Sequence, residues 1–350
     1  MDKLKKYLRS AVGPLAAIII SLLIGALFIS IVGKNPVEVY LRLFGGTLGN
    51  SYGIGQVLFK STPLIFTGLA VAFAFKAGLF NIGAEGQVII GAFCSALIGF
   101  TFISLPAVIL LPLSILAGFI GGAFWGGIAG YLKARYGSHE VINTIMLNFV
   151  AAALVSYFVN EVFNVQATVH TPEISPSAYI ARFDSITGLF KGSPFNFSFL
   201  IALLVCGVFY TIISKTKYGY DVTTLGLNKH AAEYAKMKIN WLTFSSMAIS
   251  GGLAGLGGIN FVNGYKHYFE LGFSEGVGYI GIAVALIAKN NPVGVVLVSV
   301  FFGILEYGGL TVNTIVPKEL VTMLQAIVIF FVIIISKILE KKKFKILYNA

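Results

Sequence analysis

Long apolar runs alternate with short polar segments along almost the whole chain. Most are close to the roughly 20 residues that an α-helix needs to cross the hydrocarbon core of a bilayer. The runs lie at residues 11–32, 56–75, 83–103, 107–130, 141–163, 197–214, 241–262, 277–288, 293–311 and 320–336. The pattern predicts an all-α polytopic membrane protein with about ten transmembrane helices in a single domain, residues 1–350.

Three of these runs need comment. The first follows a basic N-terminus and, at 22 residues, is longer than the apolar region of a signal peptide, so we expect it to be retained as the first helix. The second contains Lys60 and Pro63, which makes its boundaries imprecise. The eighth, 277–288, is too short to span alone unless it begins near Phe273.

Composition supports this membrane assignment. The 350 residues are 57% hydrophobic and only 11% charged, with a mean hydropathy of +0.87. Soluble domains have about 45–50% apolar residues and about a quarter charged ones. The excess of apolar residues excludes an ordinary water-soluble domain.

The distribution of positive charge predicts the orientation. If the N-terminus is cytoplasmic and the ten runs alternate in direction, 18 of the 25 Lys and Arg residues lie on the cytoplasmic side and 7 outside. Cytoplasmic loops of membrane proteins carry such an excess, so both termini are expected in the cytoplasm. The net charge of +11 then reflects topology and contact with anionic lipid. It does not indicate nucleic-acid binding, because no basic stretch alternates with aromatic residues.

Two connecting segments are long. Residues 164–196 form the expected external loop, and residues 215–240 the expected cytoplasmic loop. Within the second, "LNKHAAEYAKM" predicts a short helix, with Asn228 as a good N-cap and alanines that favour helix. This helix is either a simple basic connector or a docking surface for a cytosolic partner.

The stretch "FKAGLFNIGAEGQVIIGAF", residues 75–93, places polar residues among glycines between two apolar runs. Glycines at 78, 83 and 86 allow the helix to break, and irregular backbone at membrane depth is tolerated where it lines a cavity. We expect Asn81 to cap the helix that resumes, and Glu85 to lie in its first turn, where the helix dipole stabilises a carboxylate. The stretch therefore predicts a polar, water-accessible break. The alternative is that Glu85 only satisfies its own helix end or pairs with Lys76.

Other polar residues fall inside predicted spans, where ionisable groups are costly. Glu306 lies in the ninth run, Asn143 and Asn148 in the fifth, and Gln325 in the tenth. Each is either part of a polar path or a source of hydrogen bonds between helices. A second break is expected before the eighth run. The third and eighth spans then run in opposite directions, which indicates an inverted repeat of helices 2–5 and 7–10.

Four segments resemble the successive signatures of one family. They are "TPLIFTGLAVAFAFKAGLFNIGAEGQ", "HEVINTIMLNFVA", "LGLNKHAAEYAKMKIN" and "GYIGIAVALIAKNNPVG". The chain, from about Pro36 to Ile335, is similar to the membrane permease subunits of bacterial ABC importers of the branched-chain amino acid and ribose type. The "NIGAEGQ" and "IMLN" pieces resemble the branch that carries nucleosides.

The resemblance implies a transport subunit in the bacterial cytoplasmic membrane, without a cofactor or catalytic residue. Its implied partners are a second homologous permease subunit, a cytosolic ABC ATPase, an extracellular substrate-binding lipoprotein and membrane lipid. Residues 226–236 would be the helix that couples to the ATPase, with Lys236 and Met237 where relatives often have Ala-Gly. The residues it implies for ATPase coupling are Gly226, Asn228, Ala231, Ala232 and Ala235. The candidate residues of the substrate path are Asn81, Glu85, Gln87, Asn143, Asn148 and Glu306.

Several alternatives remain at this level. Riboflavin importers use similar permeases, a simple sugar such as ribose is another candidate substrate, and an ion-coupled secondary transporter would also use broken helices. A membrane enzyme is disfavoured, because the four histidines fall in separate loops and no "GxxxxGK[ST]" phosphate-binding motif is present. ATP hydrolysis would therefore belong to another chain.

Overall fold

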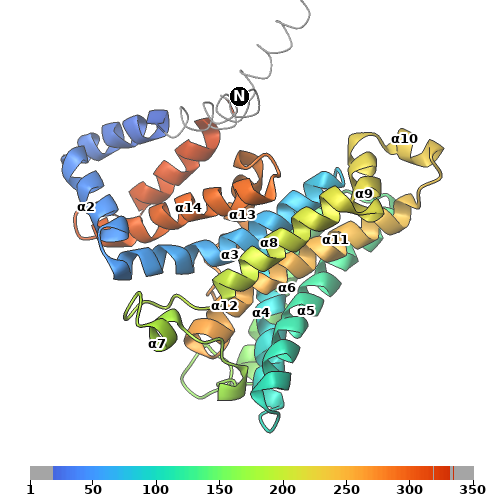
Figure 1. Ribbon diagram of the computed structural model, residues 1–350, viewed down its shortest axis with the longest axis horizontal. Coiled ribbons are helices and arrows are strands. Elements are labelled where there is room, and N and C mark those ends of the chain that lie inside the picture. The colour runs from blue at the N-terminus through green and yellow to red at the C-terminus, as the bar shows by residue number, and fades with distance from the viewer. Residues whose placement is uncertain (1–18, 318, 332–333, 335–350) are drawn as a thin grey trace, which may run out of the picture. The chain divides into compact units, whose positions relative to one another are not determined.

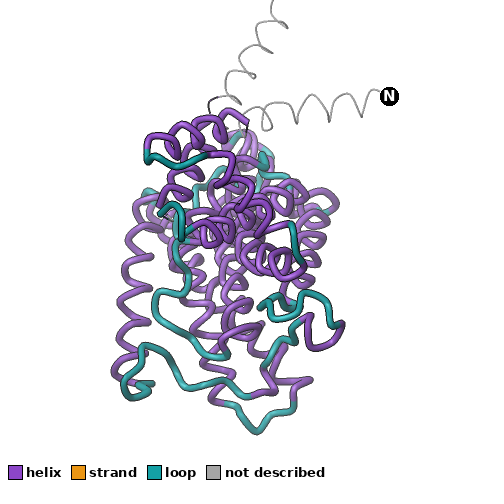
Figure 2. Tube along the Cα trace, turned by 90° about the vertical axis from the view of Figure 1, so that its left-hand side faces the viewer, coloured by secondary structure: helices purple, strands orange, loops and turns teal. Residues whose placement is uncertain are grey.

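The computed structural model describes residues 19–317, 319–331 and 334. Within these ranges the secondary structure is helical, and the tube in Figure 2 alternates helices with loops. Extended pairing in the described part is limited to two isolated bridges, His170 with Glu270 and Arg182 with Asn196. The predicted all-α class is confirmed.

The helices follow the predicted apolar runs closely (Figure 1). The longer ones are α2 (Pro36–Leu48), α3 (Ser51–Lys76), α4 (Ala84–Thr101), α5 (Ala107–Tyr136), α6 (Glu140–Tyr157), α8 (Ser198–Lys215), α9 (Lys217–Leu227), α11 (Ile239–Gly255), α13 (Val277–Ile287) and α14 (Pro292–Val312). The short ones are η1 (Phe158–Val162), η2 (Pro176–Ala178), α7 (Phe183–Thr187), α10 (Lys229–Tyr234), η3 (Leu256–Gly258), α12 (Ile259–Phe261) and η4 (Val262–Lys266). Two further apolar helices cover Ile19–Ile31 and Glu319–Phe331.

The predicted number of about ten spans is not confirmed. Among the described residues, seven helical segments are long and apolar enough to cross a bilayer. The number rises to eight if Ile19–Ile31 and α2, which are bent by 120°, form one broken span.

The eighth predicted run accounts for part of this difference, and the first and tenth runs extend into residues outside the described ranges. Helix α13 does not extend back to Phe273, because Glu275 and Gly276 adopt positive φ angles of 46° and 83°. It stops at Ile287, since Lys289 and Asn290 also have positive φ. Eleven residues give a length of about 16 Å, roughly half of a bilayer core. The run is a helix, but not a span.

Helix α3 continues through Pro63 without a break and begins five residues before the predicted 56. Proline inside a helix removes one backbone hydrogen bond. The carbonyl oxygen that Pro63 leaves without its helical donor is that of Phe59, and it accepts a hydrogen bond from Asn260 Nδ2 at 3.2 Å. The whole of the second predicted run, 56–75, therefore lies within one helix.

The chain forms two compact units, one comprising residues up to 57 and from 301, the other residues 58–300. In the first unit, the aliphatic side chains of Ile29, Val39, Leu43, Val312, Val316 and Val321 form the buried cluster. The hydroxyl of Tyr40 donates to the carbonyl oxygen of Leu22 at 2.6 Å, which fastens α2 to the preceding helix.

The second unit is organised around α5 and α11, which lie alongside each other in Figure 1. Glycines at 122, 126, 251 and 255 let the two backbones meet directly: a Cβ at Gly251 would overlap the carbonyl oxygen of Gly122. Small residues permit such close approach between membrane helices. Helix α4 packs against both partners, which positions its N-terminus inside the unit.

The predicted inverted repeat of helices 2–5 and 7–10 stays a prediction. The predicted cytoplasmic location of the two termini concerns residues 1–18 and 335–350, which lie outside the described residues.

Candidate functional site

The first helix break lies between α3 and α4, at the predicted place. Gly78 has a φ of 71° and ends α3 in a Schellman motif, in which Leu79 N donates to Ala74 O and Gly78 N to Phe75 O, at 3.0 and 3.1 Å. Glycine suits this position because it adopts positive φ without a steric penalty.

Asn81 and Gln87 pair across the break. The amide of each donates to the carbonyl of the other, at 2.8 and 3.1 Å, and Asn81 also donates to Ser250 Oγ on α11 at 2.8 Å. The prediction that Asn81 caps α4 is wrong in detail. The N-cap is Gly83, and Asn81 Oδ1 accepts the Gly83 N–H, one residue before the helix.

A second break precedes α13, again where the sequence predicts one. The chain between η4 and α13 has positive φ at His267, Gly272, Glu275 and Gly276. Such a run of left-handed residues prevents a continuous helix. As a result, the N-terminus of α13 packs against the N-terminus of α4.

Glu85 joins the two breaks. It lies in the first turn of α4, as predicted, and its carboxylate binds the start of α13. Oε1 accepts hydrogen bonds from Ser274 Oγ at 2.5 Å and from Gly276 N at 3.3 Å, and Oε2 accepts one from Gly278 N at 2.8 Å. A carboxylate near two helix N-termini is favoured by both helix dipoles. Glu85 therefore holds α13 as well as its own helix.

Asn148 on α6 is the fourth member of the cluster. Its Oδ1 accepts from Gly86 N at 2.9 Å, and its amide donates to Ile82 O at 3.0 Å and to the Tyr279 hydroxyl at 3.2 Å. One side chain thus contacts the first break, the start of α4 and the start of α13.

The cluster is closed in this structure. Asn81 is 0%, Gln87 1% and Glu85 7% exposed. The water-accessible break that the sequence predicts is therefore buried in this conformation. The part of these residues in substrate passage stays a prediction.

Two further candidate path residues lie on α6 and α14. Asn143 donates to Ser138 Oγ at 2.6 Å, at the beginning of α6. Glu306 is half-buried on α14, in the part of that helix that belongs to the first unit. Their place on a substrate path also stays a prediction.

Sequence reasoning missed three members of the cluster, namely Ser250, Ser274 and Tyr279. A signal existed for Ser274, because serine shortly before an apolar run is typical of a helix start. Ser250 is one of several serines in α11, and its hydrogen bond to Ala70 O at 2.6 Å depends on packing between distant segments.

The predicted coupling segment, residues 215–240, contains two helices where one was predicted, since α9 precedes α10. The capping role of Asn228 is confirmed: its Oδ1 accepts from Ala231 N at 3.1 Å. Ala231 and Ala235 are exposed, whereas Ala232 is 0% exposed and packs against the protein's own core. Ala232 therefore does not lie on the outer surface of α10.

The predicted external loop, residues 164–196, is folded onto the second break. Thr171 N donates to Phe269 O, and Ile174 N to His267 O. Burial lowers the pKa of His267. Its ring stacks on the ring of Tyr179, with the two ring centroids 3.6 Å apart.

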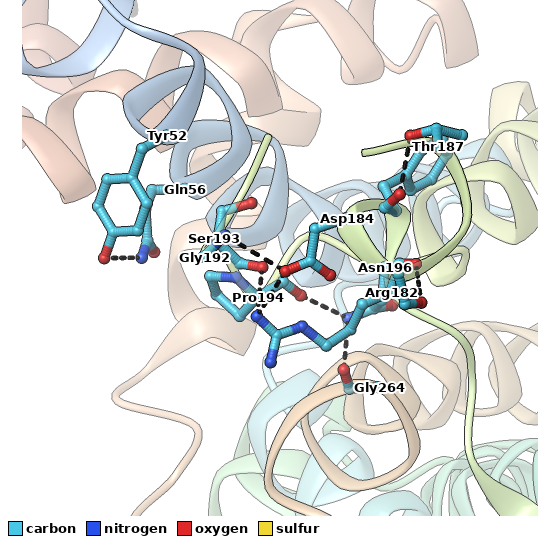
Figure 3. A network of polar contacts seen from close by, with 12 residues as sticks. Tyr52, Gln56, Arg182, Asp184, Thr187, Gly192, Ser193, Pro194, Asn196 and Gly264 are labelled. Atoms are coloured by element: carbon cyan, nitrogen blue, oxygen red, sulfur yellow. Dashed lines mark hydrogen bonds and ion pairs between the residues drawn. The ribbon is translucent and has the colours of Figure 1, made fainter. Parts of the chain in front are cut away.

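A polar network closes the end of this loop (Figure 3). Arg182 Nη2 donates to Ser193 O at 2.8 Å and pairs with Asp184 at 3.3 Å. Asn196 Nδ2 donates to the carbonyl oxygen of Gly264 at 3.2 Å. The loop is therefore hydrogen-bonded to η4, and the chain that follows η4 contains Ser274, the hydrogen-bond partner of Glu85.

Comparison with known proteins agrees with this architecture. Residues 53–334 match the family model described as branched-chain amino acid transport system / permease component. The chain is 38% identical to the guanosine ABC transporter permease protein NupP of Bacillus subtilis, over 93% of this chain and 94% of the relative. It is 35% identical to the nucleoside ABC transporter permease protein NupB of Lactococcus lactis, over 96% and 94%.

A further relative is the glucose ABC transporter permease protein TsgB13 of Haloferax volcanii, with 35% identity over 91% of this chain and 86% of the relative. No solved structure matches the chain. The family match covers most of the sequence, including both helix breaks and residues 215–240, and the relatives are ABC transporter permeases. The chain belongs to the family of branched-chain amino acid transport system permease components, and it is a multi-pass membrane permease of the ABC transporter type.

Proposed function

We propose that this chain is the permease subunit of a bacterial importer of nucleosides, located in the cytoplasmic membrane and driven by ATP hydrolysis on separate ATPase subunits. The observation that carries the proposal is its similarity, over more than nine-tenths of its length, to two permeases named for guanosine and for nucleosides. A simple sugar is the second candidate, because the glucose permease is nearly as similar.

The buried cluster supports both substrates through the same chemistry. Ribose and hexose hydroxyls donate and accept hydrogen bonds, and Glu85, Asn81, Gln87 and Asn148 supply a carboxylate and three amides. We infer that the two breaks separate during the transport cycle and expose these groups. Asn143 and Glu306 belong to the proposed path on the sequence prediction alone.

The proposed assembly contains a second homologous permease subunit, ABC ATPases and an extracellular substrate-binding lipoprotein. The docking surface for the ATPase is the exposed side of α10, with Asn228 holding the start of the helix and Ala231 and Ala235 facing outward.

Competition for uptake tests the substrate. A strain that lacks the complete transport system would be complemented with the intact system, and uptake of labelled guanosine would be competed with nucleosides, bases, ribose, glucose and riboflavin. We expect the nucleosides to compete. If the complemented strain took up labelled glucose or ribose but no guanosine, the substrate would be a simple sugar and not a nucleoside. Loss of uptake with an inactive ATPase variant distinguishes the importer from an ion-coupled carrier.

Ala235→Asp tests the docking surface. The substitution would bury an unpaired charge against the ATPase, and a cost of about 3 kcal/mol corresponds to docking about a hundredfold weaker. We expect loss of uptake at unchanged membrane abundance, measured together with co-purification of the ATPase.

Ala181→Asp is the matched control, because Ala181 is exposed on the predicted external loop. It should retain uptake and bound ATPase. Normal uptake by the Ala235→Asp protein would instead favour a simple connector at residues 226–236.

A further inference from the structure

At Gly226, the end of α9 meets the first helix break backbone to backbone. A Cβ at Gly226 would overlap the carbonyl oxygen of Lys76 and would lie 2.7 Å from Gly78 N and 2.9 Å from Ala77 C. In the other direction, a Cβ at Gly78 would lie 3.0 Å from Gly226 Cα. Such distances are shorter than normal carbon contacts, so neither glycine accepts a side chain without movement of the backbone.

Toward the surface, this contact is continuous with α10. Ala232, the inward-facing residue of α10, shares a buried cluster with Leu225 of α9 and with Ala77 and Leu79 of the break. All four are less than 8% exposed. Close-packed interiors transmit displacement because their side chains have no free volume to absorb it.

Toward the interior, the same break leads to the polar cluster. The five residues after Gly78 include Asn81, which is bound to Gln87 and Ser250, and end at Gly83, where α4 begins. The first turn of α4 carries Glu85, which holds the N-terminus of α13. A displacement of residues 76–78 therefore acts directly on the start of α4.

We propose that the backbone contact between Gly226 and Gly78 is the joint that passes movement of the coupling segment to the polar cluster at the two helix breaks. Gly78 and Gly226 are positioning residues that act through α4. A contact between two backbones contains no side-chain rotamer that could yield, so α9 cannot shift without moving the 76–78 turn. This inference rests on the proposed function, because it requires an ATPase docked on α10.

The test uses the complete importer in proteoliposomes, with two variants and two matched controls. Gly226→Ala inserts a methyl group into the joint, and Gly207→Ala is its control, because a Cβ at Gly207 on α8 meets nothing within 4 Å. Asparagine tolerates positive φ, so Gly78→Asn preserves the conformation of the turn while adding a side chain at the joint. Gly137→Asn is its control, with a φ of 65° and nothing within 4 Å.

We expect both joint variants to raise the ATP hydrolysed per substrate molecule imported by about tenfold or more, a barrier change of about 1.4 kcal/mol. Both controls should give the wild-type ratio. The amount of ATPase that co-purifies should match the wild type for all four, because none of the four glycines lies on α10, the proposed docking helix.

A second measurement follows the break itself. In a background without Cys94 and Cys206, Ile82→Cys would be labelled with a small water-soluble thiol reagent with and without ATP. We expect ATP to change the labelling rate in the parent and the controls, and not in the joint variants.

The outcomes separate the two proposals. A wild-type importer that neither binds the ATPase nor moves nucleoside would overturn the proposed function. The proposed joint would be wrong if the wild-type importer works and the joint variants keep the wild-type ratio of ATP hydrolysed to substrate imported. They would also have to keep the ATP-dependent labelling of the Ile82→Cys protein. Loss of assembly in both joint variants would also overturn it, because the glycines would then be required for folding and not for transmission.

Discussion

Glu85→Ala is expected to abolish uptake and to lower the thermal stability of the protein. The substitution leaves the hydroxyl of Ser274 and the N–H groups of Gly276 and Gly278 without their acceptor. Each buried donor that loses its partner costs about 1–3 kcal/mol. Since these donors form the start of α13, the second break should lose its fixed position. Uptake at equal membrane abundance and thermal unfolding in detergent measure the two effects.

Glu85→Gln should fall between alanine and wild type. Glutamine keeps the volume of the side chain but offers one acceptor oxygen and a donating NH2 group. Ser274 can accept from that NH2 group, whereas the N–H groups of Gly276 and Gly278 can only donate. At least one hydrogen bond is therefore lost or weakened, even if Glu85 has a purely structural role.

The control for both substitutions is Glu161→Gln, at an exposed carboxylate on η1, which should behave as wild type. Wild-type stability of the Glu85→Ala protein would contradict the capping role that we assign to this residue. Wild-type uptake by the same protein would remove Glu85 from the proposed path.

Gly251→Val is expected to prevent folding of the second unit. A Cβ at residue 251 would overlap Gly122 O and lie 2.9 Å from Gly126 Cα. Both neighbours are backbone atoms, so α5 and α11 would have to move apart. Overpacking of a core typically costs about 1–3 kcal/mol when side chains can shift, and we expect more here. Size-exclusion profiles of the detergent-solubilised protein, with its melting temperature, measure the effect.

Gly127→Ala on α5 is the matched control. Its added methyl group would meet side chains only, at 3.3 Å from Phe244 and 3.6 Å from Ala248. Side chains can adjust by such small amounts, so this variant should stay monodisperse with a melting temperature near that of the wild type. A Gly251→Val protein that is equally monodisperse and stable would show that the α5–α11 contact is less close than described.

Helix positions could be predicted well from the amino-acid sequence. The predicted runs 107–130 and 197–214 correspond to α5 and α8, and both helix breaks lie where glycines and polar residues interrupt apolar runs. The reason is physical: in lipid every backbone group must be paired internally, so a long apolar run has to be helical. Residue types with a local effect, such as Asn228 at the start of α10, were predictable because an N-cap side chain bonds a backbone N–H only a few residues away.

The path of the eighth predicted run was not predictable in this way. Hydropathy places 277–288 in an apolar environment but does not give its path. Its length is limited by left-handed residues on both sides, and three of these, Glu275, Lys289 and Asn290, are not glycines. A non-glycine residue holds positive φ only when the surrounding structure compensates the steric cost, and that compensation comes from tertiary contacts.

The partners of the polar residues also depended on the fold. The sequence places Glu85 at the start of a helix, and its chemistry requires donors or a cation there. That the donors come from residues 274–278, about 190 positions away along the chain, follows from the approach of α13 to α4. In the same way, Gly226 in α9 and Gly78 in the turn after α3 are far apart in the sequence and adjoin each other only after packing. Local sequence determines which groups need a partner, whereas long-range packing determines which partner they meet, because a hydrogen bond or a backbone contact requires two segments at one place.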